Sequence, residues 1–468
     1  MAQPPADPTF HAASPLSTDV PSEELAYVAL QSVGGDGRPD ALGIIDTHLG
    51  SASYGQLVGR MEFPNVEQEL HHVAWNACGS RHCGCAPNAR ATRRYLIAPG
   101  VRSSRIHIVD THPDPRRPKL VKVIEGDEVA RQTGYVMPHT ARCGPDGIYV
   151  NALGAADGGG PGGIFVLDQD TFAMRGAWER ERGPQYLACA SAWHRAHGTL
   201  LTSEWGTPDM VRNGLVPELL VGRKYGHALH VWDLRERRHI KAIDFGAEHQ
   251  MVLELRPAHN PTRAYGFAGV VLSLVDLSSS VFLWYLDRSN GNGVGEWKAR
   301  KVIRIPAEPA DPSLLPPILV GSAAVPPFIA AINLSVDDRF LYVSCWGTGE
   351  LRQYDVSDPF NPVLTAVARL GGIVRRASHP RAPMTALNGG PQTVEVSRDG
   401  RRVYVTNSLH AAWDAQFYPE GIRGWLAKFD VGRAGGLVPD ARFFVDFEPG
   451  TRPHHVRLLG GDASSDSC

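Results

Sequence analysis

Apolar and aromatic residues in this chain are gathered in short runs of about five residues, separated by polar turns rich in glycine and proline. Val, Ile, Tyr and Phe dominate the runs, as is typical of β-strands. Few segments have the 3.6-residue period of an amphipathic helix. The pattern therefore predicts an all-β fold, with the clearest strands at residues 106–110, 147–150, 164–168, 229–233, 340–344 and 402–406.

One short pattern, an apolar or aromatic run that ends in aspartate, recurs seven times along the chain. The intervals between these aspartates are 64, 58, 65, 54, 68 and 75 residues, about 64 on average. A repeat of this length with about four strands per unit predicts a seven-bladed β-propeller. Each aspartate is expected to cap the turn after its strand by accepting a hydrogen bond from a downstream amide. The aspartates are Asp46, Asp110, Asp168, Asp233, Asp287, Asp355 and Asp430.

The innermost strand of each blade is expected upstream of each repeat, close to the propeller axis. The last such strand lies beyond the seventh aspartate, so we expect N- and C-terminal strands to pair and close the ring. The outer strands of that blade would come from residues 41–46. Residues 26–468 would then form a single propeller domain, preceded by a disordered arm at residues 1–25. The expected inner strands lie at residues 70–73, 138–141, 187–193, 249–255, 330–334, 391–394 and 453–456.

Three of these inner strands carry histidine at the equivalent position: the His71-His72 pair, His139, and the His454-His455 pair. Ring closure would make the three strands consecutive around the axis, so their imidazoles would converge at one mouth of the central channel. Neutral imidazole binds copper, zinc, iron and nickel, so the pattern predicts a metal site. The alternative is that one histidine of each pair packs structurally and the others are solvated channel residues.

Two further residues could take part in chemistry at this channel. Cys78 follows the first histidine pair by six or seven residues, and an alternating strand there would bring the thiol near the channel. Glu204 could act as a general acid or base, or orient a histidine, or simply be a surface carboxylate. Cys83 and Cys85 do not match a standard zinc spacing. They could capture a metal or chalcogen, or be incidental thiols of a glycine-rich loop.

Composition and charge narrow the classes of function. Hydrophobic residues make up 43% and charged residues 21% of the chain, and 47 basic against 49 acidic residues give a net charge of −2. The lack of basic excess argues against a dedicated nucleic-acid binder. No apolar run of about 18 residues predicts a membrane span. Seven scattered cysteines and no export signal favour the cytoplasm, or the periplasm if a signal peptide is missing from this sequence.

Motifs across residues 71–466 resemble those of the selenium-binding protein/methanethiol oxidase family. They include His71-His72-Val-Ala-Trp-Asn76-Ala-Cys78, His139-Thr-Ala-Arg-Cys143, Ser203-Glu-Trp205, Gly389-Gly-Pro-Gln392 and Gly460-Gly-Asp462. The resemblance implies a seven-bladed propeller that oxidises methanethiol with O2 and water to formaldehyde, hydrogen sulfide and hydrogen peroxide. Bacterial members are regarded as copper enzymes. By position, the resemblance implies copper held by His71, His72, His139 and His454. We further expect Glu204 to accept a proton and Cys78 to act as a thiol relay.

The sequence also leaves other functions open. Animal members of the family have a cysteine proposed to hold selenium where this sequence has Gly55, so the resemblance does not carry selenium binding through that residue. The chain could instead be a non-enzymatic propeller that binds selenium, sulfur compounds or a metal, in transport or as an interaction platform. A lactonase-type hydrolase would use mainly carboxylate and asparagine ligands around calcium, which a histidine-rich channel does not favour. The expected partners are a small thiol and O2, and protein partners are left open.

Overall fold

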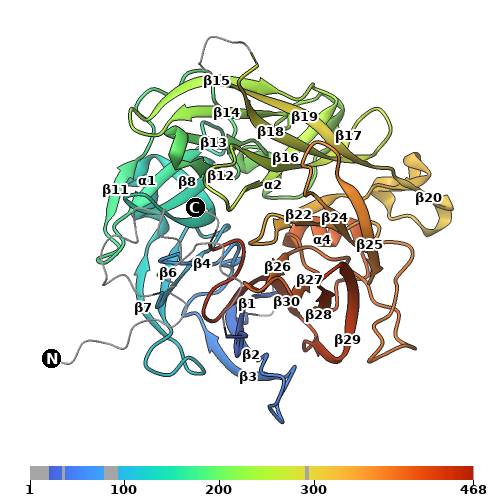
Figure 1. Cartoon of the computed structure of the whole chain (residues 1–468). Coiled ribbons are helices and arrows are strands. Elements are labelled where there is room, and N and C mark those ends of the chain that lie inside the picture. The colour runs from blue at the N-terminus through green and yellow to red at the C-terminus, as the bar shows by residue number, and fades with distance from the viewer. Residues whose placement is uncertain (1–20, 34–36, 79–92, 290–294, 467–468) are drawn as a thin grey trace.

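The structure is a computed structural model that describes residues 21–33, 37–78, 93–289 and 295–466 (Figure 1). Seven four-stranded antiparallel sheets are arranged as blades around a central axis, which confirms the predicted seven-bladed β-propeller. The innermost strands are β4 (Ala74–Trp75), β8 (Tyr135–Gly144), β12 (Ser191–His194), β16 (His249–Pro257), β22 (Ile329–Leu334), β26 (Val394–Val396) and β30 (Thr451–Leu458).

The remaining three strands of each blade follow outward from the axis. The second strands are β5 (Tyr95–Pro99), β9 (Gly147–Ala155), β13 (Thr199–Ser203), β17 (Tyr265–Ser273), β23 (Phe340–Cys345), β27 (Arg402–Thr406) and β1 (Leu25–Ser32). The third strands are β6 (Ile106–Asp110), β10 (Gly163–Leu167), β14 (Ala228–Asp233), β18 (Ser279–Asp287), β24 (Glu350–Asp355), β28 (Trp425–Gly432) and β2 (Ala41–Asp46). The outermost strands are β7 (Lys119–Ile124), β11 (Met174–Ala177), β15 (Arg238–Asp244), β19 (Glu296–Ile305), β25 (Val363–Arg369), β29 (Gly435–Asp446) and β3 (Leu57–Glu62).

The ring is closed by the C-terminal strand, as predicted. β30 pairs antiparallel with β1, with Val456 opposite Val28 and Leu458 opposite Ala26. One blade is thus built from both ends of the chain. Most of the arm predicted at residues 1–25 lies outside the described residues, but Glu23 is buried there. Its carboxylate accepts hydrogen bonds from Arg402 Nε and Tyr404 Oη, each at 2.6 Å.

The recurring aspartates cap turns, which explains why they mark the blades. Six of the seven accept a hydrogen bond from the backbone amide two residues later, at 2.9–3.0 Å, and so fix the bend that follows the third strand. The seventh, Asp430, binds the ammonium group of Lys428 at 2.8 Å. The six capping residues are Asp46, Asp110, Asp168, Asp233, Asp287 and Asp355.

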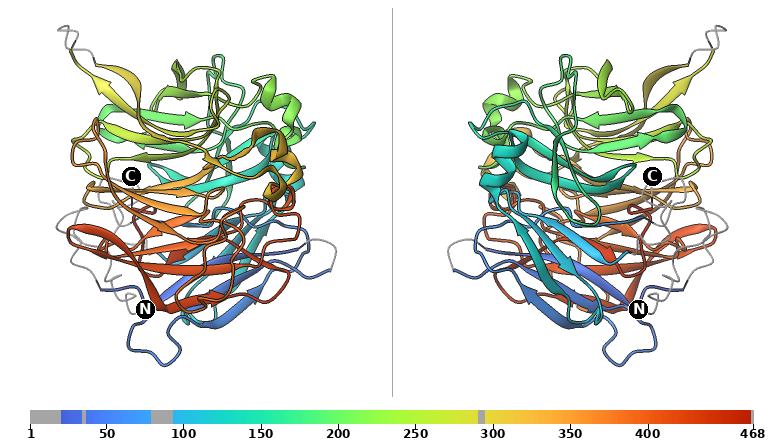
Figure 2. Two further views of the ribbon diagram at one scale, coloured as in Figure 1. Left: turned by 90° about the vertical axis from the view of Figure 1, so that its right-hand side faces the viewer. Right: turned by 90° about the vertical axis from the view of Figure 1, so that its left-hand side faces the viewer.

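Helices are short connections between strands. They are α1 (Gly126–Thr133), α2 (Pro208–Val211), α3 (Pro217–Val221) and α4 (Ala411–Phe417), and a two-stranded sheet joins β20 (Glu308–Pro309) to β21 (Ala324–Val325). Across the described ranges, no helix is long and apolar enough to cross a membrane. In the side views of Figure 2, the green helices α2 and α3 lie on one face of the propeller.

The segment after β30 folds back onto the propeller and is held by buried charges. Arg457 binds both Glu395 and Asp462, and His259 Nε2 donates to the carbonyl of Ala463 at 2.9 Å. The other ring nitrogen of His259 lies 3.1 Å from Asp338 Oδ1. Burial disfavours the imidazolium, but the hydrogen bond and charge of Asp338 outweigh it and raise the pKa of His259.

This raised pKa predicts a pH-dependent contribution to stability. The unfolded-state pKa of histidine is about 6.5, so the contribution is complete below that pH and is lost as pH rises through the folded-state pKa. His259→Gln should lower the free energy of unfolding by about 2 kcal/mol at pH 6, and by less at pH 9. Urea denaturation at both pH values measures this, with the exposed His48→Gln as control. An equal loss at both pH values would contradict the charged pair.

Candidate functional site

Three buried histidines meet on the propeller axis. One ring nitrogen from each of His71, His72 and His454 lies within 4.8 Å of the other two, so the group could hold a metal ion. His454 Nε2 and His71 Nδ1 are 3.0 Å apart. His454 comes from β30, whereas the other two residues directly precede β4. A parallel bridge between His72 and Thr140 ties this segment to β8.

The fourth predicted histidine, His139 of β8, packs against this group. Its ring centroid lies 4.4 Å from that of His71 and 5.0 Å from that of His72. Two more imidazoles adjoin the group: His455 lies 4.7 Å from His72 and His410 lies 6.2 Å from His71, centroid to centroid. His410 was missed in the sequence because it lies in a connection before α4 and not in an inner strand. We name the group of His71, His72, His139 and His454 the histidine cluster.

The histidine cluster is electrically neutral at neutral pH. Burial and the neighbouring imidazoles hold the pKa of His71 and of His72 well below the usual range. Burial also lowers the pKa of His139 to about 3 and that of His454 to about 4. A metal binds the neutral form of imidazole, so these side chains need not lose a proton to act as ligands.

Three of the four imidazoles have a nearby polar partner outside the cluster that can fix their orientation. His454 Nδ1 donates to the Ser408 carbonyl at 3.0 Å, which leaves the Nε2 lone pair facing His71. His72 Nδ1 lies 3.8 Å from Glu254 Oε1. His139 Nδ1 lies 3.9 Å from the Cys189 sulfur. Such outer contacts select the tautomer and ring direction of metal-binding histidines. Cys189 was not singled out in the sequence, where it is one scattered cysteine.

The residues present fit a metal that prefers nitrogen donors. Two nitrogens bound to one ion at about 2.0 Å, with bond angles between square and tetrahedral, are about 2.8–3.3 Å apart. The 3.0 Å between His454 Nε2 and His71 Nδ1 lies in that range. Among the described residues, the close group contains imidazoles and no carboxylate. This donor set suits copper, zinc, iron or nickel better than calcium.

Two narrow cavities lie on opposite sides of the histidine cluster along the inner strands. One, of about 30 Å³, is polar, and His72, Glu254, Arg256 and Arg457 are among its lining residues. The other, of about 20 Å³, is apolar, and Trp205, Leu253 and Trp413 line part of it. Trp205 packs edge-on against His139 with centroids 5.5 Å apart.

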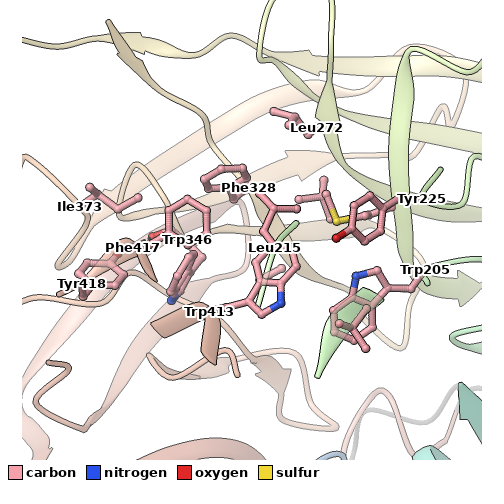
Figure 3. Packing of buried hydrophobic residues seen from close by; sticks show 14 of the residues in the cluster. Trp205, Leu215, Tyr225, Leu272, Phe328, Trp346, Ile373, Trp413, Phe417 and Tyr418 are labelled. Carbon is pink, nitrogen blue, oxygen red and sulfur yellow. Dashed lines mark hydrogen bonds between the residues drawn. The ribbon is translucent and has the colours of Figure 1, made fainter. Parts of the chain in front are cut away.

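The apolar cavity belongs to a hydrophobic cluster that covers one mouth of the channel. This cluster draws residues from several blades and from α2 and α4. Figure 3 shows its aromatic members, with Trp205 on one side and Trp346, Trp413, Phe417 and Tyr418 on the other. The histidine cluster is therefore bounded by apolar side chains toward one mouth and by charged side chains toward the other.

The two residues predicted to assist catalysis lie in different surroundings. Cys78 is fully buried after β4, and its backbone amide donates to the sulfur of Cys143 at 3.1 Å. Glu204 follows β13 and its carboxylate binds His230 Nε2 at 2.8 Å and the amides of His227 and Ala228 at 3.1 Å. The hydrogen bonds of Glu204 thus run outward along its own blade. Cys83 and Cys85 lie outside the described residues.

Gly55 occupies a backbone conformation that suits glycine. Its φ is +72°, and a β-carbon there would lie 3.2 Å from the Arg442 carbonyl oxygen and 3.3 Å from Phe443 Cα. A cysteine at this position would be strained in this chain. The local backbone therefore favours glycine at this position over the selenium-holding cysteine of the animal members.

Comparison with known proteins agrees with this architecture. The family model described as "56kDa selenium binding protein (SBP56)" matches residues 5–468. Methanethiol oxidase of Xenopus tropicalis is 37% identical over 95% of both chains, and selenium-binding protein 2 of Mus musculus is 34% identical over the same share. The X-ray structure of a hypothetical selenium-binding protein from Sulfolobus tokodaii is 49% identical, covers 98% of this chain and 99% of its own, and superposes with a TM-score of 0.93. The chain belongs to the 56 kDa selenium-binding protein family.

Proposed function

We propose that this protein is a copper-dependent methanethiol oxidase, which converts methanethiol, O2 and water to formaldehyde, hydrogen sulfide and hydrogen peroxide. The observation that carries the proposal is the buried group of neutral imidazoles at His71, His72 and His454, set between an apolar and a polar cavity. Relatives named methanethiol oxidase at 34–37% identity support the activity. The odd number of scattered cysteines favours the cytoplasm as its compartment.

His71, His72 and His454 would hold the copper, with His139 as a fourth ligand from the adjoining strand. Bound copper supplies a Lewis acid that lowers the pKa of the substrate thiol and a redox centre for O2. The Ser408 carbonyl keeps His454 in the tautomer that presents Nε2. The hydrophobic surroundings exclude water from the histidine cluster and so strengthen its electrostatic interactions.

The apolar cavity would receive the methyl group of the substrate. Its walls include Trp205, Leu253 and Trp413, and its volume of about 20 Å³ is close to that of one or two small heavy atoms. Methanethiol has two heavy atoms, so the cavity favours this thiol over longer ones. The sulfur would then face the histidine cluster, because His139 packs directly against Trp205.

Proton acceptance is best supported at His410. Its side chain is buried, and both ring nitrogens lack a hydrogen-bond partner within the described part of the chain. Glu69 Oε1 lies 3.4 Å from His410 Nδ1, which would stabilise the imidazolium. A polar cavity of about 230 Å³, lined in part by Glu69, Arg102 and Arg452, gives the proton a route outward.

Glu204 and Cys78 remain proposed as a second proton acceptor and as a thiol relay. Glu204 has His230 as its partner at 2.8 Å, and His230 Nδ1 lies 2.9 Å from His239 Nε2. This chain of groups could carry a proton outward through the blade. Cys78 is buried in the segment that follows the first histidine pair. Of these residues, His410 is the one whose ring packs beside His71.

Removing one ligand should remove both metal and turnover. His71→Ala and His454→Ala are each expected to bind less than a tenth of the wild-type copper and to release hydrogen sulfide at least about 100-fold more slowly. Metal content by mass spectrometry and a sulfide assay with methanethiol measure the two effects. The exposed His48→Ala should match the wild type. Full activity of either variant without bound metal would refute the copper scheme.

Removing the proposed proton acceptor should separate turnover from metal binding. His410→Gln is expected to keep its copper while kcat falls about 100-fold, the range of general base catalysis. Glu69→Gln should also lower kcat, but by less, because Glu69 acts only by stabilising the imidazolium of His410. Stopped-flow single turnovers and copper analysis of the same samples test this. Unchanged kcat in His410→Gln would assign the proton to another group.

The second candidate function is non-enzymatic binding of selenium, a sulfur compound or a metal. It is favoured by the similarity to selenium-binding protein 2, while Gly55 gives no selenium ligand at the family's cysteine position. The two functions differ in one measurable outcome. Copper bound at about one ion per chain without consumption of methanethiol would favour the binding protein over the oxidase.

A further inference from the structure

The polar cavity beside the histidine cluster has the features of an anion site. We propose that it binds a small monovalent anion and that, if the oxidase function proposed above holds, it receives the hydrosulfide product. We call it the arginine cavity, after Arg142, Arg256 and Arg457, which line it together with Glu254 and two serines of the C-terminal segment, Ser464 and Ser465. His72 also lines it, so it adjoins the proposed metal group directly.

The first argument is the number of guanidinium groups in the lining. Arg142, Arg256 and Arg457 line the cavity with one carboxylate, Glu254, which pairs with Arg256, while Glu395 and Asp462 outside the lining pair with Arg457. Arg256 and Arg457 are each only 7% exposed. In surroundings so poor in water, guanidinium N–H groups bind an anion more strongly than surface charges would.

The second argument is an unused buried donor. Arg256 Nη1 pairs with Glu254 Oε2 at 2.7 Å, but Arg256 Nε has no hydrogen-bond partner within the described part of the chain. A buried N–H without an acceptor costs free energy, and an arginine is the donor best suited to an anion. An anion in the arginine cavity would satisfy this group.

The third argument is a pair of oriented hydroxyls on the cavity wall. The side-chain amide of Asn151 donates to both Thr140 Oγ1, at 2.6 Å, and Ser191 Oγ, at 3.1 Å. Both hydroxyls line the cavity, and because each accepts a bond from the amide, its own hydrogen stays available for another acceptor. The cavity thus offers hydroxyl donors as well as guanidinium donors.

Size and position select the anion. A volume of about 30 Å³ open to water-sized atoms favours an anion of one or two heavy atoms over sulfate, phosphate and most carboxylates. Halides and hydrosulfide are small enough and carry one charge. Hydrosulfide is also the conjugate base of the hydrogen sulfide that the proposed reaction forms next to His72, so after loss of one proton to water the product would be drawn into the arginine cavity and away from the histidine cluster.

Chloride binding to the metal-free full-length chain tests the anion site. Wild-type protein treated with a chelator should broaden the chlorine-35 NMR signal, and sodium hydrosulfide should reverse the broadening. Arg256→Gln should weaken chloride binding at least about tenfold. The matched control is Arg300→Gln, which makes the same change at an exposed position on β19 and should leave binding unchanged.

A second variant keeps the test decisive if Arg256→Gln fails to fold. Glu254→Gln removes the one carboxylate of the lining and should strengthen chloride binding about tenfold, a result that a merely structural role would not produce. No specific broadening by the wild type, or weaker binding in Glu254→Gln, would overturn the anion site.

The two proposals fail in different ways. Chloride that hydrosulfide does not displace would overturn the product assignment. Copper-loaded protein that binds chloride in the arginine cavity but releases no sulfide from methanethiol would overturn the oxidase function, while the anion site would stand.

Discussion

The pairing of β30 with β1 is the constraint on which the rest of the molecule depends. It closes the ring, and it also places His454 beside His71, residues that are 383 positions apart in the sequence. Without closure, the blade that contains β30 would have no outer strands. The histidine cluster would also lose His454, the imidazole that comes from the C-terminal end of the chain. Fold and candidate site are therefore held by the same set of strand hydrogen bonds.

The surroundings of the histidine cluster explain why it can remain neutral and ordered. Imidazoles buried this closely would repel one another if protonated, and burial itself disfavours the charge. The polar groups that remain are oriented by neighbours such as the Ser408 carbonyl. The apolar layer toward one mouth and the arginines toward the other give the channel two chemically distinct sides.

Much of this could be predicted from the sequence because it follows from local patterns. The aspartate at the end of each third strand has a local role in its turn, so its spacing revealed the blades. Histidines in inner strands could be placed at the axis once the ring was assumed. His410, Cys189 and Arg256 could not be found in this way. Their roles depend on side chains from other blades, and His410 lies in the connection between β27 and β28 and not in an inner strand.

The use of both chain ends in one blade also bears on how the protein is made. During synthesis, His71, His72 and His139 emerge from the ribosome long before His454, which lies in the last strand of the propeller. The nascent chain can fold several blades, yet the group His71, His72 and His454 stays incomplete until β30 has been released. The complete group, which could hold a metal ion, therefore forms only when the whole ring has been assembled.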